Sequence, residues 1–203
     1  CRIVHVIPPG TDPVPQAAGS GSRQLQLLSV GAIVPRKGFD VLVEALATLT
    51  DPSWQLTIVG DRGRDPGAVE RLDSLIAQHG LEARIESPGT VSTERLAELY
   101  AGADLFVLAS HFEGYGMAYA EAIAYGLPIV GTTGGAIPRT VPESASRLVP
   151  PGNVAALAQA LREVMESRDC RRNLAAGARA AAAKLPSWVQ SGATFADLLD
   201  GLA

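Results

Sequence analysis

The chain has 203 residues and a formal net charge of −4 at pH 7, and 47% of its residues are hydrophobic. This length predicts one domain with a well-filled core, and the large share of hydrophobic residues excludes an intrinsically disordered chain. The acidic balance argues against nucleic acid as a partner. Cys1 and Cys170 are too few for a disulfide framework or a zinc site, so we expect free thiols in a reducing compartment. No apolar run is long enough to cross a bilayer. The chain begins with Cys rather than Met and shows no signal-peptide pattern, so we expect a piece of a longer protein.

Strand-like and helix-like segments alternate along the chain. We expect strands at Ile3–Ile7, Leu25–Val30, Leu56–Val59, about 84–86, 104–109, Pro128–Gly131 and Leu148–Val149. We expect helices from Phe39, over about 68–79, over 93–101, after Gly116 and throughout the tail after Gly152. Residues 11–22 are rich in Pro, Gly and Ser and are interpreted as a linker.

Three of the expected helices carry apolar stripes. The stripes consist of Phe39, Leu42, Val43 and Leu46; of Val154, Leu157, Leu161, Val164 and Met165; and of Phe195, Leu198, Leu199 and Leu202. The strands are continuous apolar runs rather than alternating ones, which is typical of a parallel sheet covered on both faces. Repeated strand–helix units predict a doubly wound, Rossmann-like α/β fold, in which ligands bind outside the carboxyl ends of the strands.

Two carboxylates bracket the segment E-G-Y-G-M-A-Y-A-E, from Glu113 to Glu121, and the expected strand at 104–109 precedes it. The glycines place a helix start between them, and the unpaired N–H groups of a helix start attract phosphate. Carboxylates accept hydrogen bonds from sugar or ribose hydroxyls, so the pattern indicates a pocket for a phosphorylated, hydroxyl-rich ligand. A tight strand-to-helix turn with two solvated acids would show the same pattern.

A second cluster follows the strand at Leu25–Val30, in the segment S-V-G-A-I-V-P-R-K-G. Arg36 and Lys37 could clamp a diphosphate, Lys as a point charge and Arg as a planar fork, although two solvated cations on a surface loop remain an alternative. Neither a Walker loop nor G-x-G-x-x-G follows the first strand, which argues against a nucleoside triphosphatase and a nicotinamide dehydrogenase.

Taken together, these motifs resemble the C-terminal, donor-binding half of family 4 glycosyltransferases, which have two facing Rossmann-like domains (the GT-B architecture). The resemblance covers nearly the whole chain and is strongest at E-G-Y-G-M-A-Y-A-E-A-I-A-Y-G-L-P-I-V-G-T (113–132). The other matching segments, in the family's order, are V-I-P-P-G-T-D (6–12), V-G-A-I-V-P-R-K-G-F-D-V-L-V-E-A-L (30–46), L-T-I-V-G-D (56–61) and L-A-E-L-Y-A-G-A-D-L-F-V-L-A-S (96–110).

The resemblance implies a role for each matching residue. Glu113 would contact hydroxyls of the donor sugar, Glu121 would hold the ribose, and Lys37 would neutralise the diphosphate leaving group; Glu113 and Lys37 are the expected catalytic pair. Backbone groups at the edge of the sheet would complete the donor site: Gly31, Gly60, Val91, Gly114, Tyr115, Gly116, Met117 and Ala118. The family's usual Arg after the strand's Gly is replaced by Ala32 in this chain, so we expect Arg36 to serve instead.

The expected function is therefore transfer of a sugar from a nucleotide-diphosphate donor, such as a UDP-sugar, to an acceptor, with retention of configuration. The resemblance implies no obligatory metal or other cofactor, and an acceptor site on an N-terminal domain outside this chain. A binding module that transfers nothing by itself is the alternative from another class, and an inactive isolated fragment is expected in either case. We expect residues 1–22 to be an interdomain crossing, 23–185 the nucleotide-sugar domain, and 186–203 a helix that packs toward the N-terminal domain. The expected location is cytoplasmic, with peripheral attachment to the inner membrane face through that domain.

Overall fold

The computed structural model describes residues 4–50 and 53–201, and its centre is a parallel sheet of six strands. The strands are β1 (Leu25–Val30), β2 (Trp54–Val59), β3 (Ile85–Gly89), β4 (Leu105–Val107), β5 (Ile129–Thr132) and β6 (Ser146–Val149). Their order in the sheet is β3-β2-β1-β4-β5-β6. Strands β2 and β3 therefore lie on one side of β1, and β4, β5 and β6 lie on the other side. This confirms the predicted doubly wound, Rossmann-like fold, with a switch point where ligands of such sheets bind.

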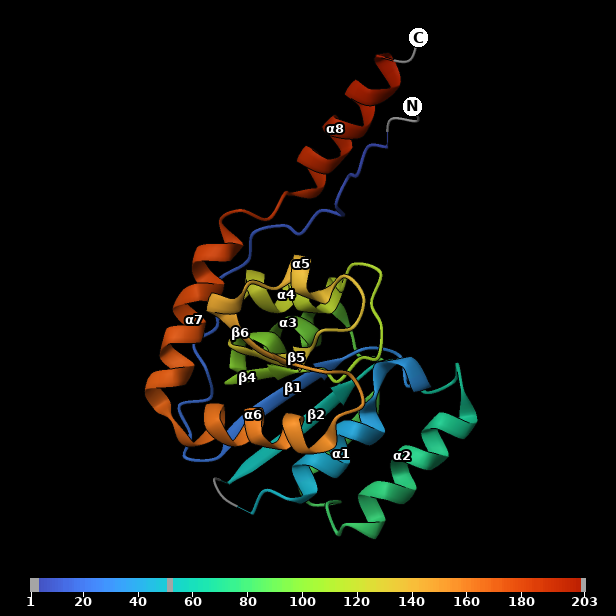
Figure 1. Cartoon of the computed structure of the whole chain (residues 1–203), viewed down its shortest axis with the longest axis vertical. Coiled ribbons are helices and arrows are strands. Elements are labelled where there is room, and N and C mark those ends of the chain that lie inside the picture. Colours follow the sequence, from blue (N-terminus) through green and yellow to red (C-terminus); the bar gives the residue numbers. More distant parts are fainter. Residues whose placement is uncertain (1–3, 51–52, 202–203) are drawn as a thin grey trace.

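Helices cover both faces of this sheet (Figure 1). The helices are α1 (Phe39–Ala47), α2 (Pro66–Gln78), α3 (Thr93–Gly102), α4 (Met117–Ala124), α5 (Ile137–Thr140), α6 (Val154–Glu166), α7 (Arg168–Ala182) and α8 (Trp188–Asp200), with short 3-10 turns η1 (Pro35–Lys37) and η2 (Glu143–Ala145). In Figure 1, α1, α2 and α6 lie in front of the sheet and α3 and α4 lie behind it. Helix α7 packs against both α4 and α6 at the side of the sheet.

The core forms where the predicted stripes meet the strands. Four of the five predicted residues of α6 are buried, among them Leu157 and Leu161 at 0% exposure, whereas Val154 is half-buried. Trp54 is also fully buried; its indole Nε1–H donates to the carbonyl of Leu49 (3.1 Å), and the guanidinium of Arg84 lies 3.9 Å from the ring centroid. Burial of such side chains, at about 1.5–3 kcal/mol each, stabilises the sheet and fixes its carboxyl edge in place.

Some helices begin with a side-chain cap and others begin at an uncapped glycine. Helices α2, α3, α6, α7 and α8 begin at Asp65, Ser92, Asn153, Ser167 and Ser187, and each of these side chains accepts a hydrogen bond from the first turn. Helices α1 and α4 begin instead at Gly38 and Gly116, both in the left-handed conformation and without a side-chain cap. Their first N–H groups therefore stay available for another acceptor.

The predicted strand at Ile3–Ile7 is wrong for the part that the structure describes, and Ile3 lies outside the described residues. Residues 4–7 form no strand, and Val4 and Val6 are 80% and 84% exposed. A strand needs a partner for its backbone groups, and this segment runs instead beside α8 (Figure 1), where the Ser191 hydroxyl donates to the carbonyl of Pro8 (2.9 Å).

The predicted linker at 11–22 contains no helix or strand, but its backbone is held to the domain. The N–H of Thr11 donates to the carbonyl of Pro186 (2.7 Å) and the N–H of Ala17 to that of Tyr125 (2.8 Å). Farther along the same segment, the N–H and the hydroxyl of Ser20 donate hydrogen bonds to the carboxylate of Asp104.

The predicted apolar stripe on α8 does not reach the core. Phe195 and Leu199 are 56% and 52% exposed, and Leu202 lies outside the described residues.

Candidate functional site

The loops that follow β1 and β4 meet at the carboxyl edge of the sheet. The N–H of His111 donates to the carbonyl of Arg36 (2.8 Å), which joins the two loops. Gly38 makes this approach possible: its φ is +64°, and a Cβ there would lie 2.1 Å from the carbonyl oxygen of Ala109. Sequence positions more than seventy residues apart thus form one surface because a glycine has no side chain.

Glu113 lies at the centre of this surface and is bound by three side chains. Its Oε1 accepts from Lys37 Nζ (2.7 Å) and from the Ser110 hydroxyl (2.7 Å), and its Oε2 accepts from Arg36 Nη1 (3.1 Å). The side chains of Glu113 and Lys37 are only 7% and 10% exposed, whereas that of Arg36 is 52% exposed. The two predicted cations and the first predicted carboxylate therefore form one ion-pair cluster.

The ionisation of Glu113 follows from these contacts. Burial acts to raise its pKa, but the hydrogen bonds from Lys37 and Ser110 and the charges of Lys37 and Arg36 outweigh burial, so the pKa lies below its ordinary value. Glu113 is thus a carboxylate over the whole physiological range. As an anion it only accepts hydrogen bonds, which suits a ligand hydroxyl.

Glu121 lies one helical turn inside α4 and has a different environment. Its Oε2 accepts from the Tyr100 hydroxyl (2.8 Å), and burial raises its pKa above the ordinary value, although Tyr100 and the charge of Lys37 oppose the rise. Glu121 and Tyr100 line a pocket of about 250 Å³ that also includes Met117, Thr93 and the segment Gly10–Asp12. The second predicted carboxylate therefore lines a cavity.

Lys37 connects the two carboxylates, because its charge acts on both Glu113 and Glu121. The space for its side chain comes from Gly31, where a Cβ would lie 2.9 Å from Lys37 Cε. An ammonium group has three donors, and Glu113 takes one of them. The remaining donors can serve an anion at the same edge.

The turn between the two carboxylates leads into α4. Gly116 has a φ of +93°, which favours glycine, and it ends the loop that contains Gly114 and Tyr115. The first residues of α4, Met117 and Ala118, follow it without a side-chain cap. Their N–H groups and the positive end of the helix make this turn suitable for a phosphate or a sugar oxygen.

The other predicted residues lie at the same edge but differ in what they contact. At Gly60 a Cβ would lie 1.9 Å from the carbonyl oxygen of Gly31, so this glycine allows two neighbouring strand ends to approach. Val91 is half-buried in the loop between β3 and α3, two residues before Thr93 in the 250 Å³ pocket. The structure thus brings Glu113, Lys37 and Arg36 into direct contact, and the remaining predicted residues surround them along the edge.

Two residues of the site were not predicted. Ser110 donates to Glu113 in a fully buried bond, and Tyr100 donates to Glu121. Ser110 directly follows the apolar run 105–109 that contains β4, and a polar residue at that position is a signal that sequence reasoning could have used. Tyr100 gives no local signal, since its partner lies 21 residues away and its ring also stacks on Tyr125 at 4.9 Å.

Within residues 4–50 and 53–201, no group of three or more His, Cys, Asp or Glu side chains could hold a metal ion. Among the same described residues, no helix is long and apolar enough to cross a membrane.

Comparison with known families identifies the protein family to which this chain belongs. Residues 12–181 match the family model described as glycosyl transferases group 1. The chain belongs to this family.

Relatives within the family support the same assignment. The chain is 32% identical over 96% of its length to D-inositol 3-phosphate glycosyltransferase of Xylanimonas cellulosilytica, of which it covers 50%. It is 34% identical over 69% of its length to mannosylfructose-phosphate synthase of Agrobacterium fabrum, of which it covers 35%. The chain thus spans about half the length, or less, of these relatives.

Solved structures agree with the fold. Sucrose-phosphate synthase from Thermosynechococcus elongatus superposes with a TM-score of 0.86 and 29% identity, over 98% of this chain and 52% of that one. Anabaena Alr3699/HepE in complex with UDP-glucose superposes with a TM-score of 0.81 and 25% identity, over 88% of this chain and 49% of that one. The described domain therefore has the Rossmann-like fold of one half of a GT-B glycosyltransferase, and it corresponds to the C-terminal half that the sequence predicted.

Proposed function

We propose that this chain is the donor-binding domain of a retaining, family 4-type glycosyltransferase that uses a nucleotide-diphosphate sugar. The observation that carries the proposal is the buried Lys37, which bonds Glu113 at 2.7 Å and whose charge also acts on Glu121. Two carboxylates, a lysine and an open helix start at one sheet edge match the parts of such a donor: sugar hydroxyls, ribose hydroxyls and a diphosphate.

Each part of the donor has a counterpart in this arrangement. The diphosphate would lie between Lys37, Arg36 and the N-terminus of α4, where fixed positive charge is concentrated. The sugar would reach Glu113, and the ribose would reach Glu121 in the 250 Å³ pocket. Arg36 supports the proposal that it replaces the family Arg absent at Ala32, because its guanidinium lies 3.1 Å from Glu113.

The chemistry of the reaction fits these positions. Departure of the nucleoside diphosphate builds negative charge on its phosphate oxygens, and groups that are fixed in advance stabilise that charge without reorganisation. Lys37 is fixed by burial and by Glu113, so it can stabilise the leaving group from its resting position. The proposal needs no metal ion, since the chain supplies the cations itself.

A binding module that transfers nothing by itself is the alternative, and it is what we propose for this chain in isolation. The acceptor would bind to an N-terminal domain, as the half-length match to the relatives suggests. We further propose that the whole protein works in the cytoplasm and attaches to the inner membrane face through that domain.

Calorimetric titration of the chain with UDP, GDP, ADP and NAD tests the proposal. We expect weak binding of one nucleoside diphosphate, and UDP is the first candidate because the similar Anabaena protein was solved with UDP-glucose. Lys37→Ala should weaken binding by about 1.5–3 kcal/mol, the range for a hydrogen bond to a charged group. Arg71→Ala, an exposed cation on α2, is the matched control and should have no effect. Equal affinities of the Lys37 variant and the wild type would contradict the proposed clamp.

A further inference from the structure

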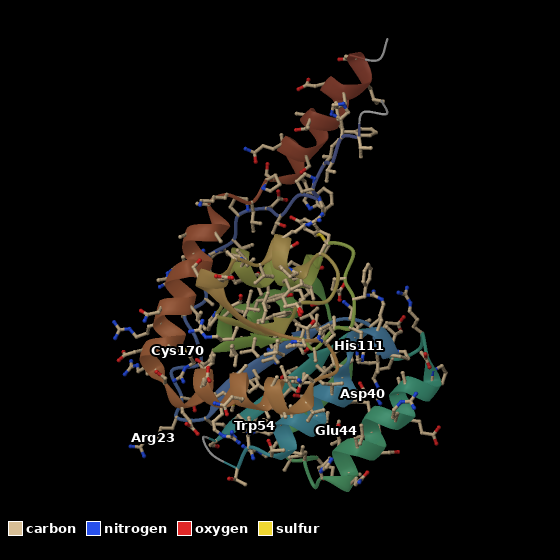
Figure 2. The ribbon with its side chains drawn as sticks, viewed as in Figure 1. Arg23, Asp40, Glu44, Trp54, His111 and Cys170 are labelled. Carbon is tan, nitrogen blue, oxygen red and sulfur yellow. The ribbon has the colours of Figure 1, made fainter. Side chains whose placement is uncertain are left out.

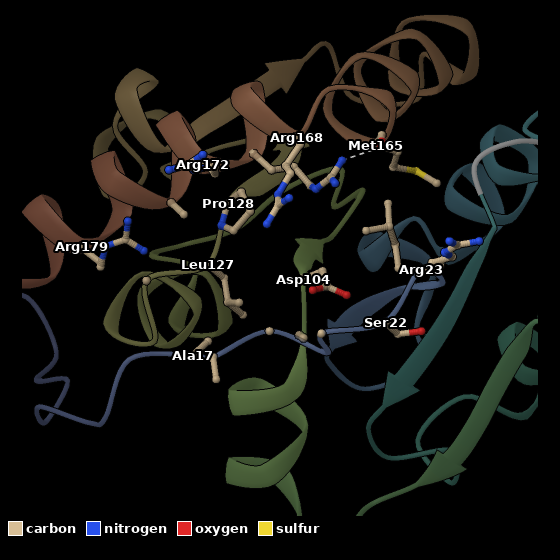
Figure 3. A pocket seen from close by; sticks show the side chains of 18 of the residues that line it. Ala17, Ser22, Arg23, Asp104, Leu127, Pro128, Met165, Arg168, Arg172 and Arg179 are labelled. Carbon is tan, nitrogen blue, oxygen red and sulfur yellow. Dashed lines mark hydrogen bonds between the residues drawn. The ribbon is translucent and has the colours of Figure 1, made fainter.

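A second cavity, of about 680 Å³, lies at the opposite edge of the sheet, where β1, β4 and β5 begin. Its lining includes Leu25 and the residues just before β4 and β5, Asp104 and Pro128. One wall is α7 and the other is the segment 17–23, which crosses in front of these strand ends (Figure 3). Figure 2 shows Arg23, at this edge, on the other side of the domain from His111 at the donor edge.

The charge of this cavity is opposite to that of the chain. Five arginines line it, namely Arg23, Arg168, Arg171, Arg172 and Arg179, against two carboxylates, Asp104 and Glu166, whereas the whole chain has a net charge of −4. Three of the arginines belong to one face of α7, because positions 168, 172 and 179 are separated by whole turns of a helix. A concentration of cations in a concave site attracts anions strongly.

Within the described residues Asp104 forms no ion pair with these arginines, and its oxygens accept hydrogen bonds from other donors. It accepts from the N–H (3.0 Å) and hydroxyl (2.6 Å) of Ser20 and from the N–H of Gln26 (2.8 Å). These bonds give Asp104 a structural role, because they hold the segment that forms the second wall.

The arginines themselves divide into one that is held in place and others that are available. Arg171 donates through Nη1 to the carbonyls of Val164 (2.9 Å) and Met165 (2.5 Å). Burial lowers the pKa of Arg171; the charge of Asp104 opposes this and that of Arg168 adds to it. Within the part of the chain that the structure describes, Arg168, Arg172 and Arg179 take part in no side-chain hydrogen bond or ion pair.

We propose that this cavity binds a soluble anion that carries two or more phosphate groups, such as a diphosphate ester. An arginine fork binds phosphate through two parallel bonds, which is why free guanidinium groups favour phosphate over a single-atom anion. Along α7, Arg168 and Arg172 are about 6 Å apart and Arg172 and Arg179 about 10 Å apart in helix rise, so one phosphate cannot engage all three. The site is a cavity between a helix and a bonded backbone segment rather than a flat surface, which favours a small ligand over a membrane.

Titration of isotopically labelled protein with inorganic pyrophosphate, followed residue by residue through backbone amide NMR signals, tests the proposal. We expect saturable shifts in α7 and in segment 17–23, which are separable from any shifts near Gly116 at the donor edge. The double variant Arg168→Gln/Arg172→Gln should weaken pyrophosphate binding at this cavity at least about ten-fold, as loss of charged hydrogen bonds predicts. The matched double variant Arg71→Gln/Arg95→Gln, on exposed positions of α2 and α3, should leave it unchanged within about two-fold.

Other outcomes would overturn the proposal. Absence of saturable shifts in α7, or equal shifts in both double variants, would remove the site. If orthophosphate binds as tightly as pyrophosphate, the requirement for two phosphate groups is wrong. If the protein ignores pyrophosphate but sediments with vesicles of phosphatidylcholine and phosphatidylglycerol through Arg168 and Arg172, the ligand is a lipid surface. Because the signals report each edge separately, failure here leaves the proposed donor site untouched, and failure of the donor site leaves this cavity testable.

Discussion

Replacing Lys37 by methionine should destabilise the domain even when no ligand is present. The variant keeps most of the length of the side chain but removes its ammonium group, which leaves Glu113, whose side chain is 7% exposed, without its 2.7 Å partner. Removal of one partner from a buried ion pair typically costs about 3–5 kcal/mol. Arg36 at 3.1 Å and Ser110 at 2.7 Å remain bound to Glu113, so we expect a smaller loss of about 2–4 kcal/mol in the free energy of unfolding.

Urea denaturation at pH 7, followed by circular dichroism, measures this loss. The second variant, Glu113→Gln, and the double variant complete a cycle, and the double variant should lose at least about 1 kcal/mol less than the sum of the single losses. A loss below about 1 kcal/mol for Lys37→Met, or the same loss in both backgrounds, would refute the reasoning from burial and pairing.

The pH dependence gives a further check on the same pair. The folded pKa of Glu113 is depressed, so its contribution to stability is present above the ordinary value of 4.5 and is lost as the pH falls through the folded pKa. Lys37→Met removes the first of the contacts that depress this pKa. The difference in stability between wild type and variant should therefore shrink below about pH 4.5.

Three further changes test other parts of the structure. Glu121→Gln should raise the free energy of unfolding at pH 8 by about 0.5–1 kcal/mol. The folded pKa of Glu121 is raised, so this residue stabilises the fold below its unfolded pKa, and that stabilisation is lost as the pH rises. The gain in the variant should therefore vanish at pH 4, and nucleotide binding should weaken. Gly38→Ala should cost at least about 2 kcal/mol more than Gly80→Ala, since both have a φ of +64° but only Gly38 faces a carbonyl at 2.1 Å; equal losses in urea would contradict this. Asp104→Asn removes a charged acceptor of Ser20 and should cost about 1–3 kcal/mol and accelerate proteolysis within residues 17–23; unchanged cleavage would show that the segment is held otherwise.

The strands of the sheet were predicted well, because the short apolar runs that indicate a strand are a local feature of the sequence. Strand β1 has the predicted bounds Leu25–Val30, and β2 begins only two residues before the predicted Leu56. The same local signal failed at residues 4–7, where Val4, Val6 and Ile7 form a short apolar stretch but the segment has no neighbouring strand. Helix α5 (Ile137–Thr140) was missed because a single turn has no measurable periodicity.

The site was predicted in outline but not in its electrostatics. The order of motifs along the chain placed Glu113, Glu121 and Lys37 at one sheet edge. The opposite pKa shifts of the two acids depend on Lys37 and Ser110 for Glu113 and on burial for Glu121, and the Lys37 contact spans 76 residues. The arginine cavity was missed for a related reason, since cations at helical spacing usually face solvent and only the fold brings segment 17–23 opposite α7.

The contact between the N-terminal segment and α8 has a mechanical consequence. Three hydrogen bonds join the two segments: the Thr11 N–H donates to the Pro186 carbonyl, the Trp188 N–H to the Asp12 carboxylate (3.2 Å) and the Ser191 hydroxyl to the Pro8 carbonyl. The N-terminal segment and α8 therefore leave the domain side by side (Figure 1). Tension applied between the two ends would reach these few bonds before it reached the sheet. In a single-molecule pulling experiment they should rupture at low force as an early, separate event, while the strands stay assembled until a higher load.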